Sequence, residues 1–456
     1  MWSWSPWLQI YLAALSFELW GLNTVAGRLP FALAGAACVV LIYVMIKKYF
    51  NDLPWARLSS LFLALSVPFL LHSRQCRYYA LGAFLVLICI YFFRSKWQTR
   101  TVPFVILVMA LAFLFYTNYL LFFSFSFALF LAAITFYRDE LPLAKVVALC
   151  LSVFVFTFPS LLSFRLGQQF TFLNLSLFGI FFREYFIDLF TFIIPLPIFL
   201  VIMWKLSQSA IKKSTISITP DERFILFLML VIILNIASLS LIPQFFFRYL
   251  VHLYPLSFII LGWVVVRLYR YQKLSGVLLA ILIGLTNWLH VQPLEWVHLI
   301  NRPRYNDFQM LTFTNVPLKL YLSEMFVKYP DVNQSLINYF LKNAHSSDTI
   351  VTTYDDLPLM FYTSFTILGG LQGRVPDRNH IPEWIVKRYY TRLNRRGELL
   401  KSETYVSNQT WIDKHYDRHV LFLPDETFGN SPDPFDHRFI PLGESYIPLV
   451  TYQKRK

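Results

Sequence analysis

Long apolar stretches separated by short polar segments run through the first two thirds of the chain. Each stretch holds about 17 to 25 residues, the length that an α-helix needs to cross the hydrocarbon core of a membrane. The pattern therefore predicts about ten membrane helices within residues 27–292. The apolar runs start near Leu29, Ala56, Cys76, Val102, Tyr119, Ala144, Phe186, Phe224, Leu250 and Ser275.

The pattern changes after Pro293, where short helical and strand-like segments replace the long apolar runs. A helix is predicted to end near Asn343, followed by a strand over 350–353, a turn, a short helix and a strand ending at Gly369. The segment EWIVKRYYTRLNRRG (383–397) predicts a later helix, and RHVLFLP (418–424) predicts another strand. Residues 293–456 are therefore predicted to form a small α/β domain.

One basic cluster stands out in this domain. It is predicted to be the solvated face of the later helix, with contact to anionic lipid as the alternative. Its members are Lys387, Arg388, Arg392, Arg395 and Arg396.

Composition agrees with a membrane protein. Of the 456 residues, 57% are hydrophobic and only 14% are charged, whereas soluble proteins are about 45 to 50% apolar and about 25% charged. The net charge of +14 does not indicate nucleic acid, because nearly all of the excess lies in the loops between apolar runs. Orientation in the membrane explains such loop charges.

The loop charges predict which side each loop faces. When loops are assigned alternately to two sides, one side holds fifteen basic residues and the other holds six. The positive-inside rule makes the richer side cytoplasmic, which places residues 293–456 and the amino terminus outside. The six outer residues are Arg28, Arg74, Arg77, Arg165, Arg183 and Arg248.

The first 26 residues form a separate segment. Ser5 to Gly21 is apolar but short and is interrupted by Glu18, so it is predicted to be an interfacial amphipathic helix on the outer membrane surface. Met1 is followed by tryptophans instead of a signal peptide. Because an outer amino terminus needs export, we expect that the natural protein begins earlier or that this start codon is misplaced.

The four cysteines lie in or beside apolar runs, and their spacing matches neither a disulfide framework nor a metal site. They are predicted to be small buried apolar residues. Their positions are Cys38, Cys76, Cys89 and Cys150.

Several outer arginines lie beside tyrosines and could hold a phosphate at the membrane surface. Arg74 and Arg77 are three residues apart and are predicted to share a helix face, while Arg28 is predicted to cap a helix start. The alternative is that these arginines extend toward lipid headgroups or pair with outer carboxylates. The candidate phosphate ligands are Arg28, His72, Arg74, Arg77, Tyr78, Tyr79, Arg248 and Tyr249.

These features resemble a known family. GRLPFAL before a helix ending in KKYF, then HSRQCRYYAL, RYLVHLYPLSFIILG and SSDTIVTTYDDLPLMFYT, are similar to membrane-embedded GT-C glycosyltransferases. The closest group resembles the bacterial glycosyltransferase family 39 relatives, which include aminoarabinose transferases and protein O-mannosyltransferases. The likeness covers most of the chain and implies a GT-C-type fold.

The resemblance also implies an activity. Such enzymes transfer a sugar from a polyprenyl-phosphate carrier to an acceptor on the outer face, often with a divalent cation such as Mg²⁺ or Mn²⁺. Their catalytic carboxylates lie in a first external loop that would precede this chain's first residue, so no base can be carried over. Some relatives have an acidic residue near the position of Tyr79, whose hydroxyl cannot supply that charge.

Three carboxylates remain as weaker candidates for a base: Glu18, Glu184 and Asp188. Glu18 is more simply a water-facing residue of the interfacial helix. Glu184 and Asp188 lie four residues apart on one predicted helix face and could pair with Arg183 or favour the helix amino terminus.

The sequence thus predicts a glycosyltransferase of the bacterial inner membrane that acts on a polyprenyl-phosphate-linked sugar and an unidentified glycan, lipid or protein acceptor, and does not bind nucleic acid. One alternative is a carrier-binding pseudoenzyme. Another is a transporter or flippase, which is disfavoured because no Gly/Pro-broken helices are visible in matching halves and no acidic residue is predicted deep in a helix.

Overall fold

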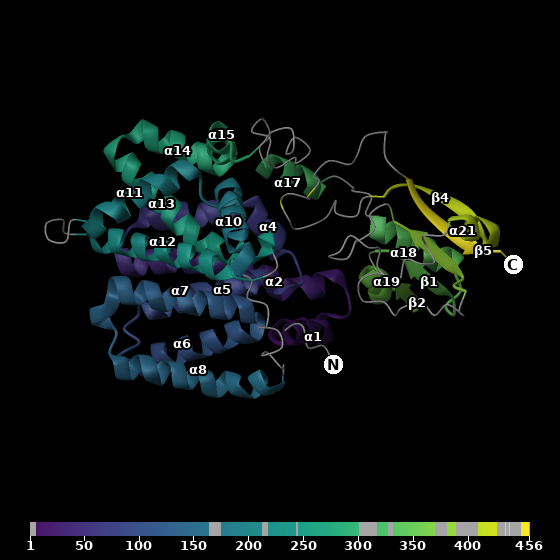
Figure 1. The fold of residues 1–456 in the computed structure, drawn as a ribbon, viewed down its shortest axis with the longest axis horizontal. Helices are drawn as coiled ribbons and strands as arrows, with labels where there is room; N and C mark the ends of the chain where they lie inside the picture. The colour runs from purple at the N-terminus through teal and green to yellow at the C-terminus, as the bar shows by residue number, and fades with distance from the viewer. Residues whose placement is uncertain are drawn as a thin grey trace. The chain divides into compact units, whose positions relative to one another are not determined.

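The structure is a computed structural model that describes residues 6–163, 175–211, 218–242, 245–300, 317–326, 332–354, 356–369, 381–388, 409–425, 434, 437 and 448–455. It divides into two compact units. The first comprises Met1–Lys319 with Pro432–Phe435, and the second comprises Leu320–Ser431 with Asp436–Lys456. The fold is that of a polytopic helical membrane protein with a C-terminal α/β domain, as the sequence predicts (Figure 1).

Every apolar run of the membrane unit contains a helix. The elements are α1 (Leu8–Trp20), α2 (Thr24–Phe50), α3 (Leu53–Leu65), α4 (Val67–Ser73), α5 (Tyr78–Phe93), α6 (Thr101–Thr117), α7 (Tyr119–Tyr137), η1 (Arg138–Glu140), α8 (Leu143–Ser163), η2 (Leu175–Leu177), α10 (Phe178–Phe192), α11 (Leu196–Ile211), α12 (Pro220–Leu239), η3 (Phe247–Leu253), α13 (Tyr254–Tyr271), α14 (Lys273–Leu285) and α15 (Trp288–Trp296). Five described helices are long and apolar enough to span a membrane, or up to eight if each bent pair counts as one span.

Side-chain caps decide where several of these helices begin. Asn23, Asp52 and Asn118 each accept a hydrogen bond from a backbone amide in the first turn of the helix that follows. Such caps satisfy amides that have no partner within the helix. Because α2 is capped by Asn23, the prediction that Arg28 caps this helix is wrong; Arg28 lies inside it.

Three predicted continuous segments are broken helices. α3 and α4 meet at 65°, α10 and α11 at 110°, and α14 and α15 at 90°. Pro68 and Pro195 stand at the first two breaks, where a proline lacks the amide that would continue the helix. At the third, the Thr286 hydroxyl donates to the Leu282 carbonyl (2.8 Å) and accepts from the Trp288 amide (3.3 Å), which competes with helical bonding.

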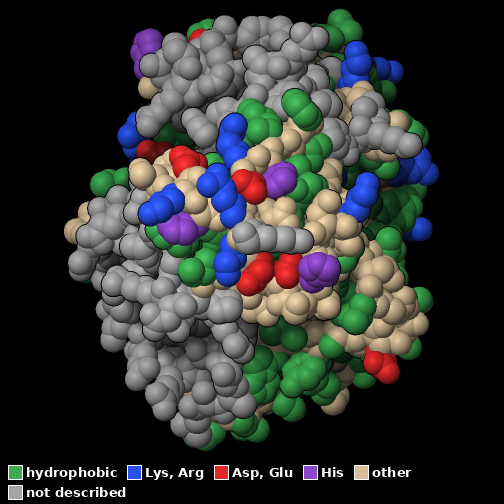
Figure 2. Space-filling view, turned by 90° about the vertical axis from the view of Figure 1, so that its right-hand side faces the viewer, with side chains coloured by type: hydrophobic (Ala, Val, Ile, Leu, Met, Phe, Trp, Pro, Cys, Tyr) green, Lys and Arg blue, Asp and Glu red, His purple; other side chains and the backbone are tan. Residues whose placement is uncertain are grey.

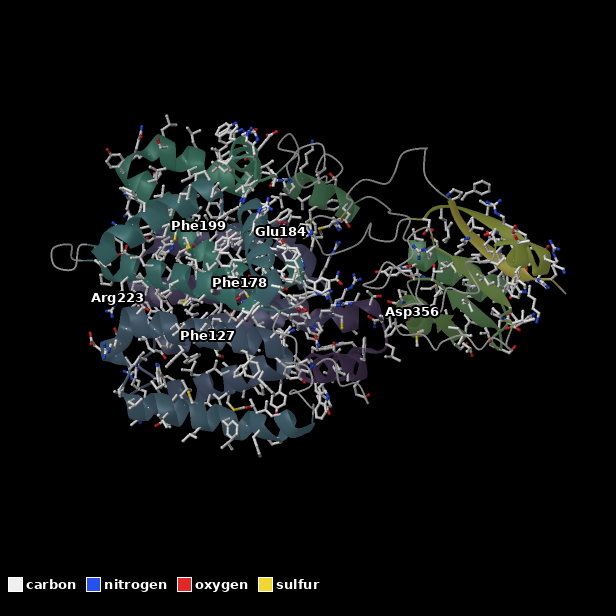
Figure 3. All side chains as sticks on the ribbon, in the orientation of Figure 1. Phe127, Phe178, Glu184, Phe199, Arg223 and Asp356 are labelled. Atoms are coloured by element: carbon white, nitrogen blue, oxygen red, sulfur yellow. The ribbon has the colours of Figure 1, made fainter. Side chains whose placement is uncertain are left out.

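The residues that the charge pattern sorts to the cytoplasmic side gather at one end of the membrane unit. Arg94 and Arg223 each lie 3.6 Å from a Glu140 carboxylate oxygen, and both guanidinium groups cover the Tyr137 ring. Arg223 also donates to the Phe136 carbonyl. Figure 3 shows Arg223 and Glu184, which the charge pattern sorts to opposite sides, at opposite ends of this unit.

The C-terminal unit contains one mixed sheet with the strand order β2-β1-β3-β5-β4. β1, β2 and β3 are parallel, and β5 pairs antiparallel with both β3 and β4. The elements assigned to this part are α17 (Pro317–Phe326), which starts in the membrane unit, α18 (Val332–Asn343), β1 (Thr349–Thr352), α19 (Asp356–Tyr362), β2 (Thr366–Gly369), β3 (Trp384–Lys387), α21 (Gln409–His415), β4 (Tyr416–Pro424) and β5 (Pro448–Lys454).

The predicted helix over 383–397 is wrong in its described part. Trp384 to Lys387 form the central strand β3, because these apolar residues are buried between the two faces of the sheet. Trp384 packs on Phe340 from one side, while Ile385 belongs to the cluster on the other. The sequence analysis also missed β5, whose partner strands are distant in the chain.

The two described members of the basic cluster, Lys387 and Arg388, do not lie on a solvated helix face. Arg388 is only 1% exposed, and its Nε donates to an Asp425 carboxylate oxygen over 2.6 Å. Its backbone amide donates to the Thr353 hydroxyl (3.0 Å). Lys387 donates to the Gln409 side chain (2.8 Å). Arg392, Arg395 and Arg396 lie outside the described residues.

Figure 2 shows one face of the molecule on which basic and acidic side chains lie intermixed. No large patch of a single sign stands out among the described side chains on that face. Intermixed charges are typical of a solvated surface.

The buried Arg388–Asp425 pair supports a stability prediction. Replacement of Asp425 by Ala leaves the guanidinium buried without this carboxylate and should destabilise the C-terminal unit by about 3 kcal/mol or more. Hydrogen exchange of the β3 amides in the whole protein measures the loss. The double variant Arg388→Met with Asp425→Leu removes both charges and should recover most of the protection; equal protection in wild type and Asp425→Ala would contradict the prediction.

Candidate functional site: an anion pocket at the start of α5

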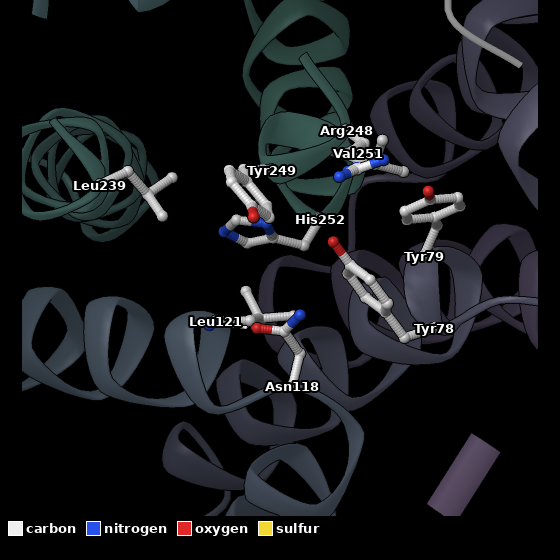
Figure 4. Close-up of a pocket in the computed structure, with 9 residues that line it drawn as sticks. All are labelled: Tyr78, Tyr79, Asn118, Leu121, Leu239, Arg248, Tyr249, Val251 and His252. Carbon is white, nitrogen blue, oxygen red and sulfur yellow. Dashed lines mark hydrogen bonds between the residues drawn. The ribbon is translucent and has the colours of Figure 1, made fainter. Parts of the chain in front are cut away.

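A pocket forms where four elements of the membrane unit meet. It is lined by residues from the amino-terminal turn of α5, the start of α7, the end of α12 and η3. Figure 4 shows the Arg248 guanidinium and the tyrosine hydroxyls around the same space. The lining residues are Tyr78, Tyr79, Asn118, Leu121, Leu239, Arg248, Tyr249, Val251 and His252.

The pocket is largely apolar but carries a positive charge. Arg248 carries its charge, and none of the nine lining residues is an Asp or Glu. Arg248 lies on the short 3₁₀ helix η3, with its guanidinium carbon 4.0 Å above the Phe246 ring and 5.9 Å from the Tyr249 ring centre. These aromatic faces hold the guanidinium by cation–π attraction, and Tyr249 also hydrogen-bonds to it. The other N–H groups of the guanidinium can bind an anion.

Tyr78 supplies a hydroxyl that is buried and has no hydrogen-bond partner among the described residues. Buried polar groups in proteins are usually hydrogen-bonded, so this hydroxyl is available to bond a ligand in the pocket. Tyr79 lies beside it at a ring separation of 4.6 Å and accepts a hydrogen bond from Arg77 Nη1 over 3.4 Å. The pocket therefore joins two of the predicted arginines through Tyr79.

His72 lies behind Tyr79 and does not line the pocket. Its ring is 5.1 Å from Tyr79 and 5.8 Å from Phe247. His72 Nδ1 faces the Pro68 carbonyl at 2.8 Å, so this nitrogen carries the proton and Nε2 is an acceptor in the neutral ring. In this tautomer the acceptor nitrogen does not donate to a phosphate oxygen, and the ring packs against Tyr79. The role of His72 as a phosphate ligand stays a prediction.

Arg74 and Arg77 do not share a helix face. α4 ends at Ser73 and α5 starts at Tyr78, so both arginines lie at the turn between two helices. Arg77 is the N-cap residue of α5 and points Nη1 to Tyr79, whereas Arg74 and Arg28 lie outside the pocket lining. Arg165 lies outside the described residues.

None of the three candidate carboxylates lines the pocket. Glu18 is exposed on α1, and Glu184 pairs with Arg183 at 3.7 Å, as the sequence suggested. Asp188, by contrast, is only 4% exposed within α10. The described residues contain no group of three His, Cys, Asp or Glu side chains that could hold a metal ion. The divalent cation that the resemblance implies stays a prediction.

The sequence analysis missed a buried polar chain beneath the pocket. His252 Nε2 lies 3.1 Å from Asn235 Oδ1, and Asn235 Nδ2 donates to the Ser124 hydroxyl over 3.3 Å. This chain joins η3 to α12 and α7 and thereby fixes the segment that carries Arg248. The position of Asn235 within an apolar run could have indicated this chain, because polar side chains inside a membrane are usually paired or functional.

These groups can bind one anionic head group. A guanidinium and several hydroxyls around a low-dielectric pocket form charge-assisted hydrogen bonds with phosphate oxygens, which are the strongest that neutral and basic side chains offer. The site supplies no described base and no metal ligands, so its own chemistry is the stabilisation of negative charge.

The chain is similar to known proteins in part of its sequence and in its fold. Residues 5–160 match the family model described as dolichyl-phosphate-mannose-protein mannosyltransferase. Two crystal structures of ArnT from Cupriavidus metallidurans have a similar fold at 13% identity. The apo structure gives a TM-score of 0.53 over 98% of this chain and 87% of that one. The structure bound to undecaprenyl phosphate gives 0.54 over 99% and 88%. No curated protein sequence matches the chain.

The fold and the site define a multi-pass membrane protein with a basic pocket among its helices. The family-model match over residues 5–160 and the ArnT-like fold agree with the resemblance to GT-C glycosyltransferases seen in the sequence.

The turn that carries Arg77 also contains an accessible thiol. Cys76 and Cys150 are exposed, which corrects the prediction that all four cysteines are buried, while Cys38 and Cys89 are buried. Partial burial raises the pKa of the Cys76 thiol, against the opposing effect of Arg28 and Arg77. Cys150 lies on α8 among exposed apolar side chains that suit lipid.

We therefore predict that a polar maleimide labels Cys76 alone. Since the thiolate is the reactive form, the rate should rise about tenfold per pH unit below the raised pKa of Cys76. Mass spectrometry of the labelled protein over a pH series measures this. Labelling that persists in a Cys76→Ser variant, or a rate that does not change with pH, would show that another thiol or group reacts.

Proposed function

We propose that this protein transfers a sugar from a polyprenyl-phosphate carrier to an acceptor on the extracytoplasmic face of the bacterial inner membrane. The observation that carries the proposal is the Tyr78 hydroxyl, buried without a partner beside Arg248 in a pocket that no acidic side chain lines. The ArnT structure of similar fold that is bound to undecaprenyl phosphate supports a carrier of this kind.

The pocket is suited to stabilise the phosphate leaving group of the reaction. The bond between the sugar's anomeric carbon and the phosphate oxygen breaks, and its electron pair stays on the phosphate. The acceptor oxygen forms the new bond to that carbon and loses its proton. Arg248 and Tyr78 would stabilise the growing negative charge on phosphate, an interaction that is stronger in the transition state than in the bound donor.

The acceptor's proton needs a base outside the pocket lining. Glu18, Glu184 and Asp188 all lie away from that lining, so we assign this role to none of them. The divalent cation stays an expectation of the family, and we derive no step through it because the described residues offer no donor set.

The sidedness is part of the proposal. Arg77 and Arg248, which the charge pattern sorts to the outer side, converge through Tyr79 and the pocket, while Arg94 and Arg223 converge on Glu140. Convergence of each set supports the alternating assignment. On that assignment the C-terminal α/β unit is extracytoplasmic.

Two alternative functions would also involve binding of the lipid carrier but no sugar transfer. A carrier-binding pseudoenzyme binds the lipid phosphate without transfer. A transporter or flippase moves it across the membrane. Three helix pairs are bent and Asp188 is buried in α10, so neither feature excludes a transporter. The family-model match and the similar fold favour the transferase.

The proposal predicts a graded loss of carrier binding. Arg248→Ala should weaken undecaprenyl phosphate binding by about 10- to 100-fold, since charge-assisted hydrogen bonds contribute about 1.5 to 3 kcal/mol. Arg248→Lys should lose less, because it keeps the charge but not the paired N–H groups. Tyr78→Phe should weaken binding by less than Arg248→Ala. Native mass spectrometry of the whole protein in lipid nanodiscs measures each affinity.

Arg183→Ala is the matched control. Arg183 is 63% exposed, pairs with Glu184 and lies outside the pocket lining, so its loss should leave binding unchanged. Equal affinities for wild type and Arg248→Ala would overturn the assignment of the pocket. Wild-type binding without transfer of a labelled carrier-linked sugar to any envelope acceptor would favour the pseudoenzyme.

A further inference from the structure

A second cavity lies where the three broken helices of the membrane unit meet. Ser66 at the α3/α4 break, Thr191 at the end of α10, and Thr286 at the α14/α15 break all line it. The space not filled by atoms is about 600 Å³ when the open solvent at the cavity mouth is included. The three bends thus surround one space, although they are far apart in the sequence.

Broken helices inside a membrane are costly, because the freed backbone groups have no water to bind. They are tolerated where they are enclosed in protein or line a cavity, and in transporters such breaks form substrate sites. One break has many explanations. Three breaks around one cavity point to a ligand that uses the polar groups exposed there.

The lining indicates the chemistry of that ligand. No charged side chain lines the cavity; hydroxyl, amide and imidazole groups lie among the rings of Phe62, Phe192 and Phe258. His290 Nδ1 lies 2.7 Å from the Phe190 carbonyl and so carries the proton, which makes Nε2 an acceptor for a hydroxyl donor. Neutral hydrogen-bonding groups between aromatic walls suit an uncharged, hydroxyl-bearing ligand.

The cavity is close to the anion pocket. The Phe192 ring, which lines the cavity, is 5.3 Å from Phe247, and Phe247 is 5.8 Å from His72. His72 in turn packs on Tyr79, which lines the pocket. The rings of Phe192, Phe247, His72 and Tyr79, in contact one after another, therefore connect the neutral site to the basic one.

We propose that this second cavity, around Ser66, Thr191, Thr286 and His290, binds the acceptor and takes an uncharged hydroxyl-bearing head group such as a sugar residue. The inference rests on the proposed function, since a transferase must hold donor and acceptor side by side. The anion pocket then selects the carrier by its charge, and the neutral cavity selects the acceptor by its hydroxyl groups.

A photoreactive alkyl β-glucoside tests this directly, because it is an uncharged glycoside with an apolar tail. The whole protein in lipid nanodiscs is irradiated with the probe, and the labelled residues are mapped by mass spectrometry. We expect labelling within residues 62–68, 191–192 and 284–290, and we expect it to persist in excess undecaprenyl phosphate. Displacement by that lipid would assign the cavity to the carrier chain, and labelling spread over the lipid-facing side of α8 would show no site; either overturns the proposal.

Gly284 allows the cavity to be filled from α14. A Cβ added at Gly284 would lie 3.3 Å from the Phe62 ring, so Gly284→Leu should lower labelling by about tenfold and Gly284→Ala by less. Ile281→Leu, one turn earlier on an exposed position, is the control and should label as wild type does.

A measurement of undecaprenyl phosphate binding tells failure of the cavity proposal apart from failure of the proposed function. If Gly284→Leu binds this lipid as wild type does and loses glucoside labelling, the cavity is the glucoside site. If it retains full labelling, or if Gly284→Ala labels less than Gly284→Leu, the proposal fails. If wild type binds no undecaprenyl phosphate, the proposed function fails, whereas the glucoside map still decides whether the cavity binds an uncharged glycoside.

Discussion

Polar groups inside a membrane must find partners within the protein, and this constraint organises the molecule. α4 ends at Ser73 and α5 starts at Tyr78, so the turn between them holds Arg77 at the edge of the apolar unit. The η3 segment brings Arg248 to the same place, where the aromatic rings hold it. The Tyr78 hydroxyl is left buried and unpaired, and a phosphate would satisfy it.

The same constraint accounts for the polar chain below the pocket and for the neutral cavity beside it. Asn235 bonds to both His252 and Ser124, which ties the arginine-bearing segment to two long helices. The breaks in α3/α4, α10/α11 and α14/α15 surround hydroxyl and amide groups instead of charges. The proposed donor and acceptor sites thus differ in charge.

Much of this could be predicted from the sequence, since each long apolar run does contain a helix, and Tyr78, Tyr79, Arg248 and Tyr249 do line one pocket. The helix breaks could not be predicted from the sequence, because a helix bends only where neighbouring helices accommodate the freed backbone groups. β3 was mistaken for a helix since its partners β1 and β5 are remote in the chain. Arg388 looked solvated because Asp425, which neutralises it, lies 37 residues away.

The most direct test is an electron cryo-microscopy structure of the whole protein in nanodiscs with undecaprenyl phosphate bound. The account predicts that phosphate oxygens lie about 3 Å from both the Arg248 guanidinium and the Tyr78 hydroxyl. A phosphate bound elsewhere in the membrane unit, with the Tyr78 hydroxyl still unpaired, would contradict it.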